Sequence, residues 1–119
     1  MMECGNSYKD LKNYIAGGSS KTVRKIDNNT VARMSGDDIV IMFQYTDICI
    51  VYPNNSRRLY TGGWYTHTTK DRFNKLLPWP FSVFQKAGTW YIRNHITKEQ
   101  WNFTDGVLVT SDIVLERGK

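Results

Sequence analysis

The chain has 119 residues, which is enough for one domain with one hydrophobic core and too few for two. Its 16 Lys and Arg against 11 Asp and Glu give a formal charge of +5, which favours acidic partners such as nucleotides, nucleic acid or acidic protein surfaces, although solubility alone also explains a charge of this size. With no signal-like start and no apolar run near 18 residues, we expect neither secretion nor contact with a membrane.

Residues 7–16 predict a short amphipathic helix. Ser7 suits the N-cap position and Asp10 follows it three residues later. Apolar residues recur at helical spacing, at Tyr8, Leu11 and Ile15. The sequence GGSS at 17–20 ends the helix and predicts a flexible joint. Residues 1–20 are therefore expected to be the most dispensable part of the chain, and the sequence leaves open whether the helix docks on the body.

From Lys21 the pattern changes to that of β-strands. Five β-branched or aromatic runs alternate with the turn sequences DNN, SGDD, TD and NNS, which predicts an antiparallel meander of about five strands. The runs at 39–43 and 48–52 are almost continuously apolar and are expected to be the central, most buried strands.

A second helix is expected at about 69–77, with Phe73, Leu76 and Leu77 as its apolar stripe and Pro78 as its stop. Two β-hairpins should follow, one turning at Ala87-Gly88 and one at Asp105-Gly106. The expected fold class is α+β and sheet-dominated, with a short N-terminal helix, the meander, a short central helix and then one or two hairpins. We treat 1–119 as a single domain with a body at 21–94 and a C-terminal extension at 95–119.

Few residues suit catalysis or metal binding. His67 and His95 stand in no HxxxH or HxH arrangement, and the carboxylates lie mostly in turns. Cys4 and Cys49 have no second Cys or His at a metal-ligand spacing, so we interpret both as free thiols in a reducing compartment. The sequence therefore predicts a protein that is not an enzyme and needs no metal or cofactor.

The segment GGWYTHTTKDRFN, residues 62–74, combines a helix start with features of an anion site. Thr68 or Thr69 can cap the helix, and the free amides of its first turn then attract anions. Lys70 and Arg72 fall within that first turn, where cations are unfavourable unless an anion compensates them.

Neighbouring residues extend this candidate site. The glycines at 62 and 63 allow close approach of a ligand, the rings of Trp64 and Tyr65 offer flat faces to a base, and Arg57 and Arg58 extend the positive surface. The candidate ligand-binding residues are Gly63, Trp64, Tyr65, Thr66, Thr68, Thr69, Lys70, Arg72, Asn74, Arg57 and Arg58.

The same segment also has an ordinary structural interpretation. Its glycines can serve a tight turn, Trp64 can belong to the core, and Thr68 with Asp71 can form a capping box. Its cations can simply be solvated. The residues alone leave both interpretations open.

Four stretches of the sequence resemble a group of small proteins encoded by bacteriophages and prophages. They are NNT at 28–30, TDI at 46–48, the motif L-x-x-GGW-x-T-x-TTK-x-R-x-N at 59–74 and VFQKAGTWY at 83–91. The resemblance covers about 23–92. It departs from the group's pattern at Tyr65, His67 and Phe73, which affects ligand preference rather than fold.

The resemblance implies a phage setting, and therefore the cytoplasm of an infected bacterial host, but no activity. The first hypothesis is a non-enzymatic binding protein that engages a phosphate-bearing ligand, a nucleotide or nucleic acid, in counter-defence. The second is an anti-CRISPR-like inhibitor that binds a host defence protein complex, with Trp79, Trp90, Tyr91 and Trp101 as anchors. A small hydrolase is the third, and whether the protein forms a homo-oligomer stays open.

Overall fold

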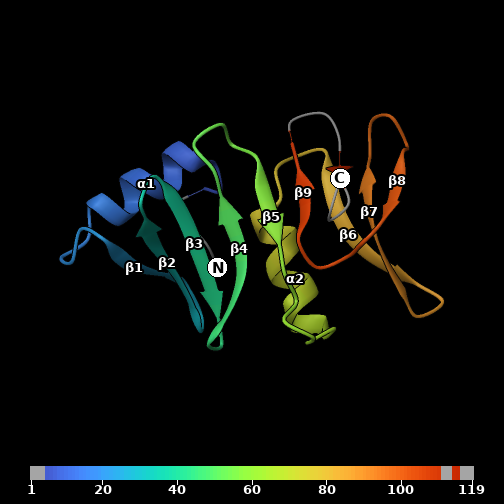
Figure 1. The fold of residues 1–119 in the computed structure, drawn as a ribbon, viewed down its shortest axis with the longest axis horizontal. Helices are drawn as coiled ribbons and strands as arrows, with labels where there is room; N and C mark the ends of the chain where they lie inside the picture. Colours follow the sequence, from blue (N-terminus) through green and yellow to red (C-terminus); the bar gives the residue numbers. More distant parts are fainter. Residues whose placement is uncertain (1–4, 111–113, 116–119) are drawn as a thin grey trace.

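The structure, a computed structural model, describes residues 5–110 and 114–115 and has two antiparallel sheets and two helices around one core. The expected α+β, sheet-dominated fold is confirmed. Figure 1 shows the seven-stranded sheet along most of the molecule, with the three-stranded sheet at the end far from the first helix. We call these the large sheet and the small sheet.

Helix α1 (Tyr8–Ala16) is part of the core. The Ser7 hydroxyl accepts a hydrogen bond from the Asp10 amide at 3.0 Å, which confirms the expected cap. Leu11 and Ile15 have no exposed surface and pack against the first three strands of the large sheet. The helix therefore docks on the folded body, a point that the sequence left open.

The large sheet begins with the predicted five-strand meander. Its spatial order is β1-β2-β3-β4-β5-β9-β10. The inner face of the sheet carries the core residues of its central strands, including Ile39, Ile41 and Cys49. The strands are β1 (Val23–Asp27), β2 (Thr30–Ser35), β3 (Asp38–Phe43), β4 (Thr46–Val51), β5 (Arg57–Leu59), β9 (Val107–Val109) and β10 (Val114–Leu115).

The small sheet contains β6 (Phe81–Lys86), β7 (Thr89–Asn94) and β8 (Gln100–Asn102). The hairpin at Ala87-Gly88 is confirmed, and both turn residues have positive φ, as a tight hairpin turn requires. The predicted hairpin at Asp105-Gly106 does not form: β8 pairs with β7, while β9 pairs with β5, so this prediction is wrong. This turn carries the chain from the small sheet to the large sheet. Asp105 attaches it to the segment just after β5 by accepting hydrogen bonds from the Thr61 amide and hydroxyl.

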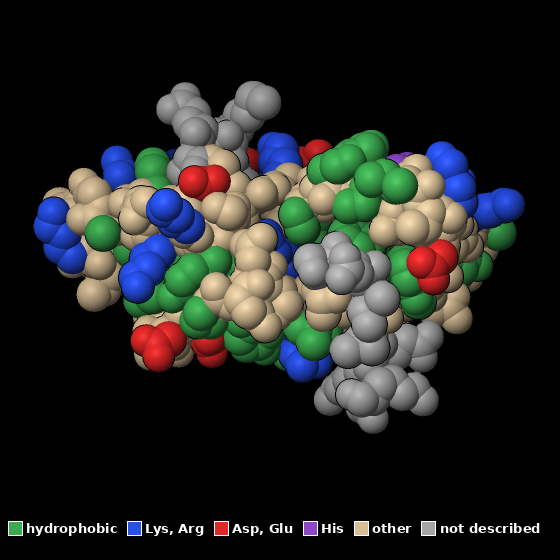
Figure 2. Space-filling view, turned by 90° about the horizontal axis from the view of Figure 1, so that it is seen from above, with side chains coloured by type: hydrophobic (Ala, Val, Ile, Leu, Met, Phe, Trp, Pro, Cys, Tyr) green, Lys and Arg blue, Asp and Glu red, His purple; other side chains and the backbone are tan. Residues whose placement is uncertain are grey.

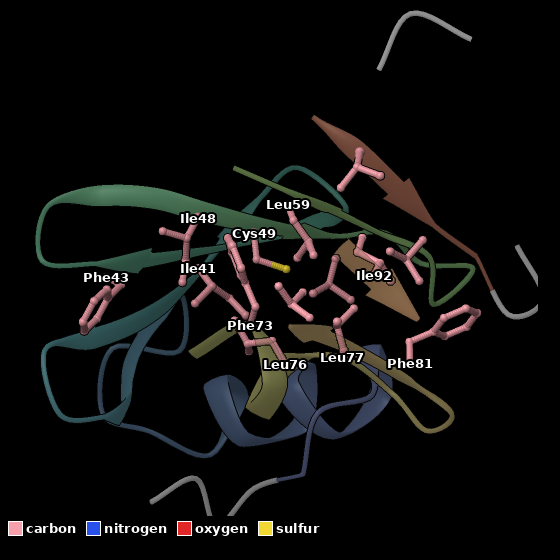
Figure 3. Close-up of a cluster of buried hydrophobic side chains, with 14 of the residues drawn as sticks. Ile41, Phe43, Ile48, Cys49, Leu59, Phe73, Leu76, Leu77, Phe81 and Ile92 are labelled. Carbon is pink, nitrogen blue, oxygen red and sulfur yellow. The ribbon is translucent and has the colours of Figure 1, made fainter. Parts of the chain in front are cut away.

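Helix α2 (His67–Leu76) lies between the two sheets and starts two residues earlier than expected. Phe73, Leu76 and Leu77 face core residues of both sheets, as Figure 3 shows. Asn74 holds the helix to the outer edge of the small sheet, since its amide both donates to the Val83 carbonyl at 3.0 Å and accepts from the Val83 amide at 2.7 Å. The Asn74 side chain thus forms hydrogen bonds with the backbone of β6, an edge strand of the small sheet.

Arg57, on the inner face of β5, is completely buried. Its guanidinium donates to the carbonyls of Leu76 at 2.6 Å and Asn6 at 2.7 Å, and to both the carbonyl and the side-chain oxygen of Asn55. Asn6 in turn donates to the carbonyls of Lys75 and Leu77. This network joins the N-terminal segment, the end of α2 and the turn between β4 and β5.

The thiol of Cys49 is free and fully buried. Burial raises its pKa to about 12, an effect that the neighbouring Arg57 charge opposes only partly. The thiol is therefore protonated and shielded at neutral pH, whereas Cys4 lies outside the described residues.

Replacing Arg57 by Lys should destabilise the protein by roughly 3 kcal/mol, because one ammonium group cannot reach acceptors on three segments and leaves buried carbonyls unsatisfied. Urea unfolding followed by circular dichroism measures this. Arg58→Lys is the matched control: Arg58 is half-buried on the opposite face, where it donates to Tyr52 and to the Gly106 carbonyl. Equal losses in the two variants would show that the Arg57 network does not carry this stability.

Cys49 should not react with Ellman's reagent at pH 8 in the folded protein. In a Cys4→Ser background, we expect essentially no release of chromophore until denaturant is added, after which one thiol per chain reacts. The folded state keeps the thiol proton that the unfolded chain loses above about pH 9, so stability should also fall as the pH rises from 9 towards 12. Rapid reaction of the native protein would contradict the burial of this side chain.

Candidate ligand pocket at the start of helix α2

Three threonine hydroxyls cluster at the start of α2. Thr66 is the N-cap, and its Oγ1 accepts a hydrogen bond from the Thr69 amide at 3.2 Å. The same oxygen lies 3.2 Å from Thr68 Oγ1 and 3.0 Å from Thr69 Oγ1. Apart from the Thr69 amide, which the cap occupies, the amides of the first helical turn have no intrahelical acceptor, so this end of the helix presents amide and hydroxyl donors together.

The loop before the helix is folded tightly against the large sheet. The Gly63 amide donates to the Thr61 hydroxyl at 3.0 Å, and the Trp64 amide donates to the Thr61 carbonyl. Gly62 has φ of +64°, and a Cβ at that position would lie 2.6 Å from Thr46 Cγ2, so only glycine fits there. The indole of Trp64 is left 64% exposed.

Between this loop, the start of α2 and the β3–β4 turn lies a pocket of about 210 Å³. Threonine hydroxyls and the Gln44 amide supply polar groups, Trp64 supplies a ring face, and none of the described residues that line the pocket is a Lys or Arg. Gln44 and Tyr45 both have positive φ, an uncommon conformation for residues other than glycine. The lining residues are Phe43, Gln44, Thr46, Ile48, Thr61, Trp64, Thr66, Thr68 and Thr69.

The structure thus brings four of the predicted site residues together, namely Trp64, Thr66, Thr68 and Thr69. Gly63 lies in the adjoining loop. Tyr65 turns away from this group: its ring packs edge-on against Trp90, with centroids 5.1 Å apart. Trp64 is exposed and does not belong to the core.

The two cations of the motif lie elsewhere than expected. Because Thr66 is the N-cap, Lys70 and Arg72 fall after the first turn of the helix. The prediction that they lie within that turn, where the helix dipole disfavours cations, is therefore wrong. Arg72 donates to the Thr30 hydroxyl and the Asn28 carbonyl and forms an ion pair with Asp71 at 3.0 Å. Lys70 extends over the Trp90 ring towards Gln85. Arg72 is therefore paired with a carboxylate, whereas the partners of Lys70 are a neutral amide oxygen and a ring face.

Three other predicted residues have structural contacts. Arg57 is buried in the network described above, and Arg58 lies on the opposite face of the sheet, since neighbouring residues of a strand point to opposite sides. The expected positive surface running from this pair to the helix start is therefore wrong. Asn74 is occupied by the backbone of β6.

Sequence reasoning missed the half of the pocket that comes from the β3–β4 hairpin. Phe43, Gln44, Thr46 and Ile48 look like ordinary strand and turn residues, and only the fold places them opposite the helix start. The TDI stretch of the phage resemblance contains two of them, Thr46 and Ile48, and was the one available indication.

The aromatic anchors expected for a protein inhibitor are only partly exposed. Trp79 is 76% exposed, but Trp90 is 5% exposed and packs in the core, so its proposed anchor role is wrong. Within 5–110 and 114–115, no group of three or more His, Cys, Asp or Glu side chains could hold a metal ion. No helix in that part of the chain is long and apolar enough to span a bilayer.

Comparison with known proteins gives one family. The Kyanoviridae Gp96 protein family matches residues 7–110, so the match includes α1 and continues through β9, well beyond the expected limits of 23–92. No curated protein and no solved structure matches the chain. Because this match covers most of the sequence, the chain belongs to the Kyanoviridae Gp96 protein family, a family of phage proteins.

Proposed function

We propose that this phage protein is a non-enzymatic binding protein that holds a small phosphate-bearing ligand, a nucleotide, in the pocket at the start of α2. In an infected cell it would act in counter-defence by withdrawing such a ligand from host signalling. The observation that carries the proposal is the convergence of Thr66, Thr68 and Thr69 hydroxyls with free helix amides beside an exposed indole.

Neutral donors suit a phosphate in this position. A helix N-terminus concentrates partial positive charge on its unpaired amides, and threonine hydroxyls rotate to donate to whichever oxygen is near. Thr68 is exposed, so its hydroxyl is accessible to a ligand without opening the core. The phosphate would therefore be recognised through dipoles rather than through Arg72, which is paired with Asp71, or Lys70, whose ammonium lies over the Trp90 ring.

Trp64 gives the pocket a second means of recognition. Its exposed ring lines the same pocket as the hydroxyls and offers a face on which a base can stack. A nucleotide would thus satisfy both the polar and the aromatic part of the site, whereas inorganic phosphate would satisfy only the first.

The other two hypotheses have less support. A direct inhibitor of a host nuclease would rely on exposed aromatic anchors, and of the four expected rings only Trp79 is strongly exposed. A hydrolase would need a catalytic group, and the described residues of the pocket lining, which are threonines, one glutamine and apolar residues, do not supply one.

Isothermal titration calorimetry with AMP, adenosine and inorganic phosphate tests the proposal. Thr68→Val keeps the shape of the side chain and removes the hydroxyl, so AMP and phosphate should both bind about tenfold more weakly, as for a lost hydrogen bond to a charged group. Trp64→Ala should weaken the binding of AMP and adenosine but leave the affinity for phosphate unchanged. The matched control is Thr89→Val, at an exposed position in β7 outside the pocket.

Lys70→Gln separates recognition by dipoles from recognition by charge. If hydroxyls and amides hold the phosphate, this variant should bind AMP within about threefold of the wild type, and affinity should depend only weakly on salt. A large loss in Lys70→Gln with none in Thr68→Val would assign the phosphate to the cation instead. Absence of binding by all three ligands to the wild type would overturn the proposed function.

A further inference from the structure

The small sheet has one buried face and one open face. In β6 and β7, Val83 and Ile92 are buried while Phe84 and Tyr91 are partly exposed, as expected for alternation across a sheet that packs on one side only. Helix α2 and the core cover the inner side. The open face, here called the outer face of the small sheet, carries Ser82, Phe84, Lys86, Tyr91, Arg93, Gln100 and Asn102.

Two stacked pairs of rings stand along this outer face. Phe84 and Tyr91 are cross-strand partners with ring centroids 5.5 Å apart and an interplanar angle of 30°. Beyond them, Trp79 stacks on His95 at 5.9 Å and 10°, with the indole 76% exposed. Ser82, two residues before Phe84, lies 2.6 Å from His95 Nε2 and so connects the two pairs.

Cations accompany these rings. Arg93 is the cross-strand partner of Ser82, which places it between the two stacked pairs, and Lys86 lies at the hairpin end of β6. Neither residue forms an ion pair within the described part of the chain, and Arg93 Nε has no hydrogen-bond acceptor there. Figure 2 shows hydrophobic and basic side chains beside one another over this end of the molecule.

The three strands of the small sheet carry polar but no acidic side chains. The sequences of β6, β7 and β8 contain no Asp or Glu, and Glu99, just before β8, is the acidic residue closest to them in sequence. The amides of Gln100 and Asn102 are exposed, opposite Arg93 and Tyr91 in the register. The face therefore combines flat rings, amides and cations that form no ion pair within the described residues.

We propose that the outer face of the small sheet binds single-stranded nucleic acid. Unpaired bases would stack on Trp79 and on the Phe84–Tyr91 pair, while Arg93 and Lys86 would contact the phosphates between them. A duplex keeps its base faces stacked internally and cannot use the rings, so the arrangement selects single strands. The surface shares no residue with the α2 pocket, so this proposal goes beyond the proposed function.

A protein partner fits the same features less well. An interface between proteins usually has an apolar centre and a polar rim, whereas here a cation lies between two aromatic pairs along one line. That alternation of ring, charge and ring matches the alternation of base and phosphate in a polynucleotide.

Fluorescence anisotropy with labelled twelve-nucleotide oligo(dT) and oligo(U), and with a duplex of the same length, tests the proposal. Trp79→Ala and Arg93→Gln should each weaken single-strand binding about tenfold, as expected for one lost stacked base or one lost phosphate contact. Lys86→Gln should lower the slope of log affinity against log salt by about 0.7. Thermal unfolding checks that each variant is folded, and Lys86 is exposed at the hairpin end, so its removal leaves the core intact.

Matched controls lie on other surfaces. Tyr45→Ala removes a ring that is 94% exposed at the β3–β4 turn, and Lys9→Gln removes an exposed cation from α1. Both should bind the oligonucleotides like the wild type. If the controls lose as much affinity for the oligonucleotides as the outer-face variants do, the interaction is non-specific attraction and the proposal is overturned.

Further outcomes separate this surface from the α2 pocket. Thr68→Val should bind oligonucleotides normally, and Trp79→Ala should bind AMP normally, so either proposal can fail alone. Equal affinity for the duplex would overturn the single-strand proposal. A stable complex with a host protein that depends on Trp79, together with no binding of the oligonucleotides, would also overturn it and would assign the face to a protein partner.

Discussion

The buried guanidinium of Arg57 sets the position of helix α2, and the candidate pocket depends on that position. Among the described residues no carboxylate forms an ion pair with this cation; its acceptors are the carbonyls of Leu76, Asn6 and Asn55 and the Asn55 side chain. Carbonyls at the end of a helix carry partial negative charge, so they stabilise a cation that burial alone would disfavour. Burial lowers the pKa of Arg57, yet an arginine stays charged under these conditions. The end of α2 is therefore fastened to β5 by the same group that satisfies the free carbonyl of Leu76.

A helix fixed at one end has a fixed start. Ten helical residues span about 15 Å, so the attachment of Leu76 to Arg57 determines where Thr66, Thr68 and Thr69 lie against the β3–β4 turn. The opposite wall is constrained as well, because Gly62 packs against Thr46 with no room for a side chain. Gln44 and Tyr45 form the two-residue turn between β3 and β4, in which both have the positive φ that a tight hairpin turn requires. The pocket is thus shaped by contacts on both sides before any ligand arrives.

The sequence predicted those parts of the structure that local patterns determine. Alternating apolar runs indicated the five-strand meander, and Ser7 with Asp10 indicated the start of α1. The prediction of a hairpin at Asp105-Gly106 failed because a favourable turn sequence does not determine which strands pair. The partner of β9 is β5, which is far away in the sequence. The start of α2 was misplaced because several threonines in succession can each cap a helix, and the one that does is Thr66. The hairpin side of the pocket and the burial of Arg57 are tertiary properties with no local pattern.

The distribution of charge explains why a net charge of +5 does not by itself locate a binding site. Around α2, the cations Arg72 and Lys75 face the carboxylates of Asp27 and Asp71 at 3.0–4.0 Å, and Arg57 is withdrawn from solvent entirely. The described residues of the pocket lining are neutral, so an anion there would interact with oriented hydroxyls and amides over a short range. The outer face of the small sheet instead carries Arg93 and Lys86 without ion-pair partners in the described part of the chain. Unpaired charges act over about a Debye length, whereas hydroxyl and amide dipoles act at contact distance. A polyanion would therefore be attracted first to the small sheet, and a small phosphate ester would be discriminated at the pocket, so the two surfaces suit ligands of different size.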